Sequence, residues 1–313
     1  MNSKNITIII PTKNRSEFVL DLVNYYHLNG YQGDLLILDA SDEEDFIKLQ
    51  KILNKFRNVK VLHTPDDYFL AIYKSIGHIK TKYVACSGDD DFFFIYGLTD
   101  CKNFLEKNDN FSSVSGLGLL AKYDATKRKI KQFSIYHIND YIHSSKGERL
   151  KSIIKNYSVL NFCLHRSSLF KKAFFHIPDN IHNSKFEILN SFSLILNGKI
   201  GKVKSFYLLR LTHNLNKKHF GDLDYYNENF QRFFKNKIYS QISEKFRLKK
   251  INQSFFSTEF IKILKQNHKK NFIKHILNVI FLRIKYPEYL KLIFLKKKEF
   301  SFKEVNLISK IVN

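Results

Sequence analysis

ITIIIPTKNR, at residues 6–15, is the segment from which the architecture can be inferred. Ile6–Ile10 is a continuous apolar run rich in β-branched residues, typical of a strand buried on both faces, and Pro11 ends it. Two more buried strands are expected in DLLILD, residues 34–39, and in KYVACS, residues 82–87. Because helix-like segments separate these strands, right-handed crossovers should connect them. The sequence therefore predicts an α/β fold with a Rossmann-like, mostly parallel sheet flanked by helices.

The starts of two helices are predicted from capping patterns. Ser41 to Glu44 has the form of a capping box and predicts a helix with Ser41 as its cap. A third strand is expected at Val59–His63. Directly after it, Thr64 can cap the next helix, with Pro65 at the first helical position.

Beyond residue 110 the pattern changes. Val114–Tyr123 and Ile130–His137 predict a β-hairpin, and Lys202–Leu211 predicts a further strand. Apolar residues at helical spacing predict helices at Leu150–Leu164 and Phe186–Leu196. We expect a catalytic domain at 1–220, made of a nucleotide-binding half (1–110) and an acceptor half (111–220), followed by a basic helical C-terminal region at 221–313.

The formal net charge of +23 is distributed unevenly along the chain. Residues 1–110 contain 13 Lys and Arg against 16 Asp and Glu, so the positive excess belongs entirely to residues 111–313. With 44% hydrophobic residues and 30 Phe, the composition is that of a folded protein and excludes a disordered polyelectrolyte. So large an excess predicts an anionic partner, either a nucleic acid, an anionic membrane surface or a phosphorylated substrate.

Cysteine content and hydropathy indicate the compartment. Cys86, Cys101 and Cys163 form no C-x-x-C pair, which favours a reducing environment. The apolar run at Ile6–Ile10 is too short for a signal peptide, and no segment approaches the roughly 20 apolar residues that span a bilayer. We therefore expect a cytoplasmic protein.

Asp89, Asp90 and Asp91 directly follow a predicted buried strand, at the edge where ligands bind in open α/β sheets. Three adjacent carboxylates repel one another unless a positive group neutralises them, and Mg²⁺ or Mn²⁺ does so with oxygen ligands. The alternative is a solvated acidic turn or a helix cap. Neither G-x-G-x-x-G nor G-x-x-x-x-G-K-[ST] occurs, which argues against a Rossmann dehydrogenase and a P-loop NTPase.

ITIIIPTKNR, LLILDAS and YVACSGDDDFFF together resemble inverting glycosyltransferases of the GT-A fold, in the large family 2 group. The tripled Asp, followed by Gly97-Leu98 and Cys101 to Leu105, is most similar to a bacterial subgroup that builds surface polysaccharides. The resemblance covers residues 5–215. It implies a nucleotide-sugar donor, a UDP-sugar being favoured, a divalent Mn²⁺ or Mg²⁺ held by a D-x-D motif, and direct displacement at the anomeric carbon. The implied acceptor is a glycan or a lipid-linked glycan.

The resemblance also implies roles for individual residues. Asp89 and Asp91 match the metal motif, and His213 is a further candidate ligand unless it is a surface histidine. Asp39 matches the carboxylate that binds the base, although it could instead cap a helix. The residues implied in binding the nucleotide-sugar are Pro11, Thr12, Arg15, Asp39, Asp67, Lys74, Asp90 and Arg210.

An inverting displacement needs a carboxylate that takes the proton of the acceptor hydroxyl. Glu187 is our first choice because it opens a predicted helix at the place where the family has its base, and Asp179 is the second. Glu187 could instead only favour a helix N-terminus electrostatically. In the absence of Trp, the aromatic acceptor platform could be formed by Tyr157, Phe162 and His165.

The basic C-terminal region, 221–313, allows two interpretations. Phe272, Ile276 and Ile280 are interleaved with Lys, as in amphipathic helices that lie on anionic membranes. This would place the enzyme on the inner face of the cytoplasmic membrane. The alternative is a helical subdomain packed on the catalytic domain or on a second copy of the chain.

Two other functions compete with the transferase. A catalytically inactive GT-A scaffold acting as a partner subunit is disfavoured because the D-x-D motif and a carboxylate for the base are both present. A nucleic-acid-binding protein is disfavoured because no recognition motif occurs and the acidic cluster repels phosphates. We therefore expect no nucleic-acid partner.

Overall fold

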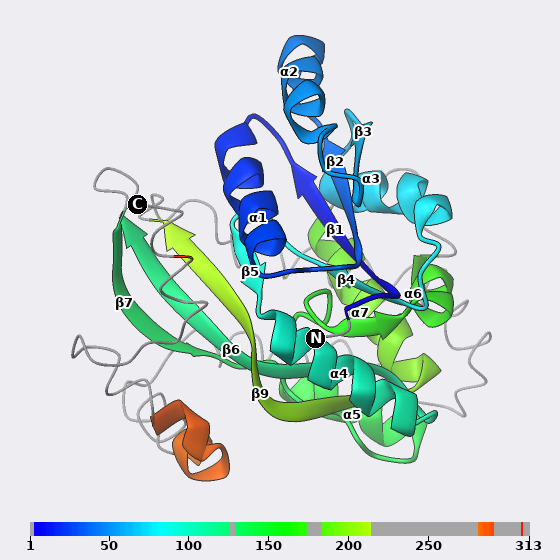
Figure 1. The fold of residues 1–313 in the computed structure, drawn as a ribbon. Helices are drawn as coiled ribbons and strands as arrows, with labels where there is room; N and C mark the ends of the chain where they lie inside the picture. The colour runs from blue at the N-terminus through cyan, green and yellow to red at the C-terminus, as the bar shows by residue number, and fades with distance from the viewer. Residues whose placement is uncertain (1–2, 125–128, 175–182, 214–280, 291–307, 309–313) are drawn as a thin grey trace.

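The computed structural model describes residues 3–124, 129–174, 183–213, 281–290 and 308 (Figure 1). Asp179 and most of the region 221–313 lie outside the described residues. The first elements are β1 (Ile6–Thr12), α1 (Ser16–Leu28), β2 (Asp34–Asp39), α2 (Glu43–Leu53), β3 (Val59–His63), α3 (Tyr68–Ser75), η1 (Ile76–His78), β4 (Tyr83–Cys86), β5 (Asp91–Phe93) and α4 (Ile95–Lys107). The later ones are β6 (Phe111–Asp124), β7 (Lys129–Tyr136), α5 (Lys146–Lys155), β8 (Leu164–Arg166), α6 (Ser167–Phe174), α7 (Asn183–Asn197), β9 (Lys199–His213) and η3 (Pro287–Leu290).

Within the described residues the strands form one nine-stranded sheet, in the order β3-β2-β1-β4-β8-β6-β9-β5, with β7 paired to β6. β3, β2, β1 and β4 run parallel, and helices flank them (Figure 1). This confirms the predicted α/β class. Because parallel strands end at the same edge of a sheet, the loops after β1, β2, β3 and β4 meet there.

The second half of the sheet contains the predicted hairpin. β6 and β7 pair antiparallel, and β9 runs parallel to β6 along most of its length. These long strands extend away from the parallel part of the sheet (Figure 1). β9 then pairs antiparallel with the short strand β5, which places Arg210 opposite Asp91. A residue from late in the chain is thus brought to the acidic turn.

Two buried tyrosines of α1 hold β5 in place. The hydroxyl of Tyr25 donates to the carbonyl oxygen of Phe93 at 3.1 Å, and the Phe93 N–H donates to the hydroxyl of Tyr26 at 3.1 Å. The Tyr25 ring also packs edge-on against Phe92, with 5.2 Å between ring centroids. Because buried backbone groups need partners, these bonds fix where the chain runs after the acidic turn.

The predicted starts of α2 and α3 are wrong. Asp42, rather than Ser41, caps α2, since the Ser41 hydroxyl bonds to Asp39 instead. α3 begins at Tyr68, because Thr64 still belongs to the edge of the sheet, where its N–H donates to the Asp39 carbonyl at 2.8 Å. Ser41 fails as a cap because Asp39 competes for its hydroxyl, whereas at Thr64 it is the backbone N–H that the sheet edge holds.

The other helix predictions have mixed outcomes. α7 confirms the helix expected at 186–196 and begins before it, at Asn183. The helix predicted at 150–164 is wrong in its second half, because α5 ends at Lys155 and Leu164 lies in β8. Leu164 pairs with Val114 of β6, so its burial comes from the sheet.

The described part of the C-terminal region packs on the acceptor half. Leu282 and Tyr286 are buried, and the Lys285 ammonium lies 3.8 Å from the Asp140 carboxylate. The Tyr286 ring also lies 5.2 Å from the Lys202 ammonium. In the parts of the chain that are described, no helix has the length and apolarity needed to cross a membrane.

The close packing of α4 against β9 can be tested by substituting the glycine at their contact. A Cβ at Gly97 would lie 2.2 Å from the Phe206 carbonyl oxygen, whereas a Cβ at Gly77 would meet nothing within 4 Å. We expect Gly97→Ala to lower the free energy of unfolding by about 1–3 kcal/mol, because the backbone of β9 must move. Gly77→Ala should leave it within about 1 kcal/mol of the unchanged protein. Urea unfolding midpoints at equal m-values measure both, and equal effects would contradict the packing described.

Candidate active site

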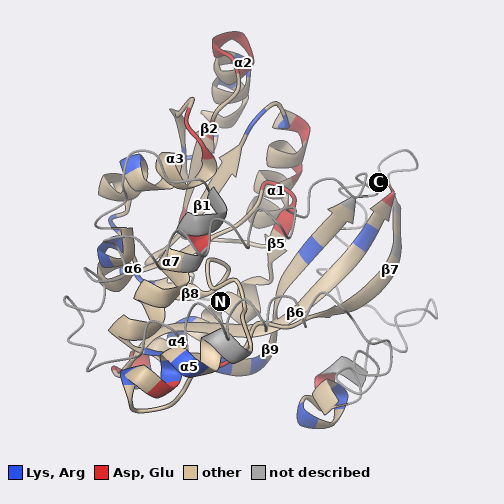
Figure 2. Ribbon diagram, turned by 180° about the vertical axis from the view of Figure 1, so that it is seen from behind, with Lys and Arg blue, Asp and Glu red and all other residues tan. Residues whose placement is uncertain are grey.

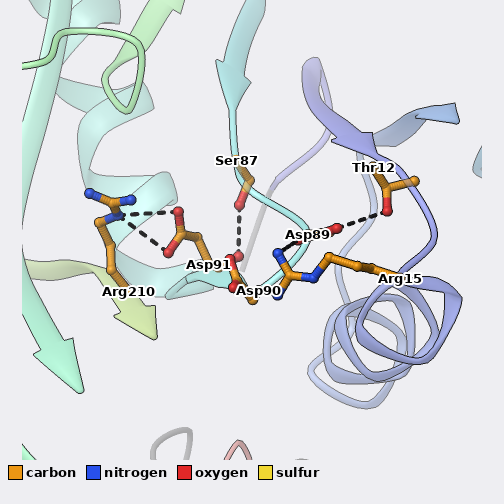
Figure 3. A network of polar contacts seen from close by, with 7 residues as sticks. All are labelled: Thr12, Arg15, Ser87, Asp89, Asp90, Asp91 and Arg210. Carbon is orange, nitrogen blue, oxygen red and sulfur yellow. Dashed lines mark hydrogen bonds and ion pairs between the residues drawn. The ribbon is translucent and has the colours of Figure 1, made fainter. Parts of the chain in front are cut away.

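Three consecutive aspartates lie in the turn between β4 and β5. The Ser87 hydroxyl donates to the Asp91 carbonyl oxygen at 2.7 Å, and the Asp91 N–H donates to the Gly88 carbonyl at 3.3 Å. Within this turn the carboxylates separate: Asp89 faces Thr12 and Arg15, and Asp91 faces Arg210 (Figure 3). Asp89 is 5% exposed and Asp91 is 2% exposed. Because buried carboxylates need charged or hydrogen-bonding partners, those partners define the site.

The loop after β1 supplies the partners of Asp89 and Asp90. The Thr12 hydroxyl donates to Asp89 Oδ2 at 2.8 Å. Arg15 bridges the two carboxylates, with Nη1 2.8 Å from Asp89 Oδ1 and Nη2 2.6 Å from Asp90 Oδ2. The Arg15 guanidinium also lies over the Phe18 ring, 4.3 Å from its centroid. Thr12, Arg15 and Asp90, predicted from the sequence as donor contacts, are thus brought together.

Arg210 is the partner of Asp91. Its Nε lies 3.2 Å and 3.3 Å from the two carboxylate oxygens. The guanidinium carbon lies 4.4 Å from the Phe162 ring centroid and 4.9 Å from that of Tyr136. Burial lowers the pKa of Arg210, but the combined interactions with Asp91 and Tyr136 outweigh burial and raise the pKa overall. Arg210 is therefore a fixed positive charge inside an aromatic enclosure.

Even with these arginines, the pKa values of the two buried carboxyls are raised, so both hold a proton more readily than an exposed aspartate. Burial raises the pKa of Asp89 to about 7, opposed by Arg15 and reinforced by Asp90. Burial likewise raises the pKa of Asp91 to about 6, opposed by Arg210. The turn is therefore under-neutralised at neutral pH, as expected of a site that receives further positive charge.

Asp39 lies at the same edge, at the end of β2, and is 1% exposed. Its Oδ1 accepts hydrogen bonds from the Ser41 N–H at 2.9 Å and from the Ser41 hydroxyl at 2.5 Å. The Asn14 N–H donates to the Ser41 hydroxyl oxygen at 2.8 Å, with Asn14 in the left-handed region at φ 54°. The loop after β1 therefore contacts both the Asp39 end of the edge and the acidic turn. Asp39 does not cap α2.

Ser41, His63 and Phe46 belong to this end of the site and were not predicted. His63 Nε2 lies 2.8 Å from the Ser41 carbonyl oxygen, so this nitrogen carries the proton. The His63 ring stacks on Phe46, with centroids 4.7 Å apart and planes 17° apart. Position is the signal that could have found His63, because it ends β3 directly beside Asp39 in the sheet register.

Glu187 lies in α7 and is held by a tyrosine. The Tyr157 hydroxyl donates to Glu187 Oε1 at 2.8 Å. Burial raises the pKa of Glu187, while the Tyr157 hydrogen bond and the Arg210 charge oppose the rise. A half-buried carboxyl with a raised pKa, under the influence of the Arg210 charge, has the properties of a general base.

Two tyrosines connect Glu187 electrostatically to the acidic turn. Burial raises the pKa of Tyr68 well above its ordinary value, with contributions from the charges of Asp91, Glu187 and Arg210. The pKa of Tyr136 is raised by burial, and the same three charges act on it. The charges of Asp91, Arg210 and Glu187 therefore act on the same two tyrosines.

Other predicted residues lie apart or outside the described structure. Asp67 is exposed at the start of α3, and Lys74 pairs with Asp66 at 2.7 Å. Pro11 is half-buried within β1. His213 ends β9, but its side chain is outside the described set, as is the whole of Asp179.

The prediction that His165 contributes to an acceptor platform is wrong. His165 is completely buried, and its Nδ1 lies 2.7 Å from the Ser113 hydroxyl. Burial lowers its pKa to about 4, so the ring stays neutral inside the protein. Phe162 and Tyr157 do lie at the site, where they contact Arg210 and Glu187.

Whether the site fits a divalent cation depends on which side chains could coordinate it. Among the residues that the structure describes, no three His, Cys, Asp or Glu side chains converge to hold a metal. Asp89 and Asp91 nevertheless offer carboxylate oxygens in an under-neutralised turn. Mg²⁺ commonly binds one or two carboxylates together with substrate phosphates. The residues therefore fit an ion shared with a phosphorylated ligand, and not a site built from protein ligands alone.

Charge around the site is also divided between the two halves. Figure 2 shows basic residues along the long strands β6 and β9 and acidic residues in α2 and near the start of β5. Part of the excess positive charge of residues 111–220 thus lies on β6 and β9, as Lys122, Lys199, Lys202, Lys204 and Arg210, and α5 and α6 carry further Lys and Arg. The carboxylates of the acidic turn come from residues 1–110.

A parallel sheet with an acidic turn at its carboxyl edge, continued by long strands that return to that turn, is a glycosyltransferase-like fold. The solved structures similar to it include residues 1–349 of S. aureus TarS, a glycosyltransferase, with a TM-score of 0.57 and 12% identity over 98% of this chain and 90% of that one. The same fragment in complex with UDP-GlcNAc gives a TM-score of 0.52 and 14% identity over the same shares. Another TarS structure gives 0.51 and 13% identity over 85% of this chain and 44% of that one. No family model and no curated protein matches the sequence.

The raised pKa of Asp89 predicts a pH-dependent stability. Between the ordinary value of 3.8 and about 7, folded Asp89 holds its proton while unfolded Asp89 loses it. The folded state then binds more protons, so stability falls as pH rises through this window. Asp89→Asn removes the titration. We therefore expect the stability of the unchanged protein, relative to Asp89→Asn, to fall by up to about 1.4 kcal/mol per pH unit across it.

Urea unfolding at a series of pH values measures this difference, which cancels contributions from the histidines. Asp109→Asn is the matched control, because the Asp109 side chain is 97% exposed. A difference between the unchanged protein and Asp89→Asn that is independent of pH would contradict the described burial.

Proposed function

We propose that this protein transfers a sugar from a nucleotide-sugar, a UDP-sugar being favoured, to a glycan or lipid-linked glycan, with inversion at the anomeric carbon. One observation carries the proposal. Asp39 and the Asp89–Asp91 turn lie at one edge of the sheet, linked by the loop after β1, and the half-buried carboxyl of Glu187 is influenced by the Arg210 charge. The glycosyltransferase-like fold and the TarS complex with UDP-GlcNAc support it. Family 2 membership and a role in bacterial surface-polysaccharide synthesis are part of the same proposal.

The donor would bind along this edge. Asp39 Oδ1 is engaged by Ser41, so the carboxylate is oriented to accept a hydrogen bond from a nucleobase N–H. Thr12 and Arg15 fix the position of Asp89, and Asp90 would contact the donor sugar. Arg210 would meet the diphosphate, because a guanidinium binds phosphate oxygens in a fork geometry. Pro11, Asp67 and Lys74 remain proposed donor contacts, and His213 remains a proposed metal ligand.

Mn²⁺ or Mg²⁺ would bind at Asp89 and Asp91 together with the donor. Its contribution would be to neutralise the charge that develops on the departing diphosphate. The under-neutralised carboxyls of the turn favour such an ion. Arg210 carries a permanent positive charge at the same place and would assist the same leaving group.

Glu187 would act as the base. Its carboxylate takes the proton of the acceptor hydroxyl while that oxygen bonds to the anomeric carbon, and the bond from this carbon to the diphosphate breaks. The products are the glycosylated acceptor and the free nucleoside diphosphate. Attack on the face opposite to the leaving group inverts the anomeric configuration.

The proposals for the acceptor and for the location of the enzyme are based on the distribution of positive charge. The basic strands of the acceptor half would attract a phosphorylated or otherwise anionic acceptor. Contact of 221–313 with the inner face of the cytoplasmic membrane would bring a lipid-linked acceptor to the site. The competing arrangement, in which this region packs on the catalytic domain or on a second copy of the chain, has support from Leu282 and Tyr286. A flotation assay of the full chain with anionic vesicles at low salt separates the two.

The donor proposal is tested by thermal shift with UDP, GDP and CDP, each with and without Mn²⁺. We expect UDP with Mn²⁺ to give the largest stabilisation, about 2.7 kcal/mol at a ligand concentration of 100 Kd. Asp91→Asn should remove the Mn²⁺-dependent part, because it removes one negative charge from the proposed ion site. Asp109→Asn, at an exposed carboxylate, should behave as the unchanged protein.

A second readout separates an enzyme from an inactive scaffold. With UDP-sugars and Mn²⁺ the unchanged protein should release UDP slowly, using water as the acceptor. Asp91→Asn should lower this release by about 100-fold, as is common when a group that stabilises transition-state charge is removed. Nucleotide binding without any turnover would favour the scaffold, and no stabilisation by any nucleotide would refute the transferase.

A further inference from the structure

The Tyr157–Glu187 hydrogen bond is a specific contact between two separate parts of the acceptor half. Tyr157 follows α5, whereas Glu187 lies thirty residues later in α7. The phenolic hydroxyl donates to Oε1 at 2.8 Å, within the normal range for an O–H···O hydrogen bond. No sequence pattern links the two residues, so the contact is a product of the fold.

We propose that Tyr157 is the positioning residue of the catalytic base: its hydroxyl holds Oε1 of Glu187, so that Oε2 receives the proton of the acceptor hydroxyl. This inference rests on the proposed function of Glu187. In the transfer step the acceptor O–H bond breaks and an Oε2–H bond forms, while Tyr157 keeps its own proton. Its role is to select one orientation of the carboxylate.

The backbone that carries Tyr157 is held firmly enough for this role. The carbonyl oxygen of Asn156 accepts from the Tyr141 hydroxyl at 2.6 Å and from the Asn139 side chain at 3.0 Å. On the other side, the hydroxyl of Ser158 accepts from the Asn139 N–H at 2.9 Å. A catalytic group is held best when its supporting residues are themselves fixed by hydrogen bonds.

The opposite partner, α7, is held by α5. Arg149 Nε donates to the Ile195 carbonyl oxygen at 2.7 Å, and its Nη1 donates to the carbonyl oxygens of His143 and Ser144 at 2.8 Å each. These three hydrogen bonds of the Arg149 guanidinium therefore go to backbone carbonyl oxygens and not to the Glu187 carboxylate. Likewise Lys171 of α6 directs its ammonium to the Ile79 carbonyl at 2.8 Å.

Among the residues that the structure describes, four further groups act on Glu187 or respond to it. Burial raises the pKa of Glu187, and Tyr157 and Arg210 lower it. Tyr68 of α3 and Tyr136 of β7 respond to its charge, and burial raises the pKa of both, so they stay neutral. Loss of the Tyr157 hydroxyl removes the first of the two opposing influences. The pKa of Glu187 must then rise further.

The test compares Tyr157→Phe with Tyr31→Phe in the full chain. Each variant loses one phenolic hydroxyl that donates a hydrogen bond, to Glu187 in the case of Tyr157 and to the Ile6 carbonyl oxygen at 3.0 Å in the case of Tyr31. The pKa of Glu187 is measured by NMR titration of ¹³C-glutamate-labelled protein, with the resonance assigned by its loss in Glu187→Gln. We expect Tyr157→Phe to move the titration to higher pH and Tyr31→Phe to leave it in place.

The pH profile of UDP release from UDP-GlcNAc, with water as acceptor, gives the kinetic counterpart. We expect the acid limb of Tyr157→Phe to move to higher pH, with about a tenfold lower rate on that limb, the effect of one hydrogen bond to a charged group. A uniform loss at every pH, with an unmoved Glu187 titration, would overturn the inference and leave Tyr157 a structural residue. If the unchanged protein releases no UDP from any UDP-sugar, the proposed function fails, whichever way the Glu187 titration moves.

Discussion

Burial of adjacent carboxylates in the turn at residues 89–91 is the constraint on which the structure depends. Repulsion and lost hydration disfavour such a turn unless positive groups reach it. Arg15 and Arg210 supply that charge from opposite sides, and they come from positions far apart in the sequence. The fold brings both to the turn, through the common edge of the parallel strands and through the β5–β9 pairing.

This arrangement links stability and function. Two arginines hold the turn, yet burial still raises the pKa of Asp89 and of Asp91 above the usual range. The unfavourable charge can be relieved by protonation or by additional positive charge. In the proposed enzyme, a divalent ion bound with the phosphorylated donor would supply that charge, and the donor would give both guanidinium groups an alternative anionic partner. The unfavourable charge of the turn would therefore favour donor binding.

The parts of the fold predicted from sequence are those in which the local pattern decides the outcome. The apolar runs at 6–10 and 34–39 form β1 and β2, and polar residues after them meet at one edge. β5 could not be predicted, since three residues carry too little pattern and the pairing partner lies near Arg210. The α2 cap was missed because Ser41 bonds to Asp39.

In the candidate site, too, some residues could be predicted from the sequence and others could not. Asp39, Thr12, Arg15 and the three aspartates follow from strand ends and the resemblance to a family. Glu187 could be chosen from the few acidic residues of the acceptor half, but its partner Tyr157 could not, because that contact depends on how α7 packs near α5. His165 was misjudged for the same reason: an isolated histidine gives no sign that β4 and β6 enclose it.

A crystal structure of the full chain with UDP and Mn²⁺, with anomalous data collected at the manganese edge, tests the central claim most directly. The claim predicts the uracil beside Asp39, the diphosphate beside Arg210, and a single anomalous peak in contact with Asp89 or Asp91. Ordered UDP bound elsewhere, or bound at this edge while both arginines keep their carboxylate pairs and no manganese is present, would contradict it.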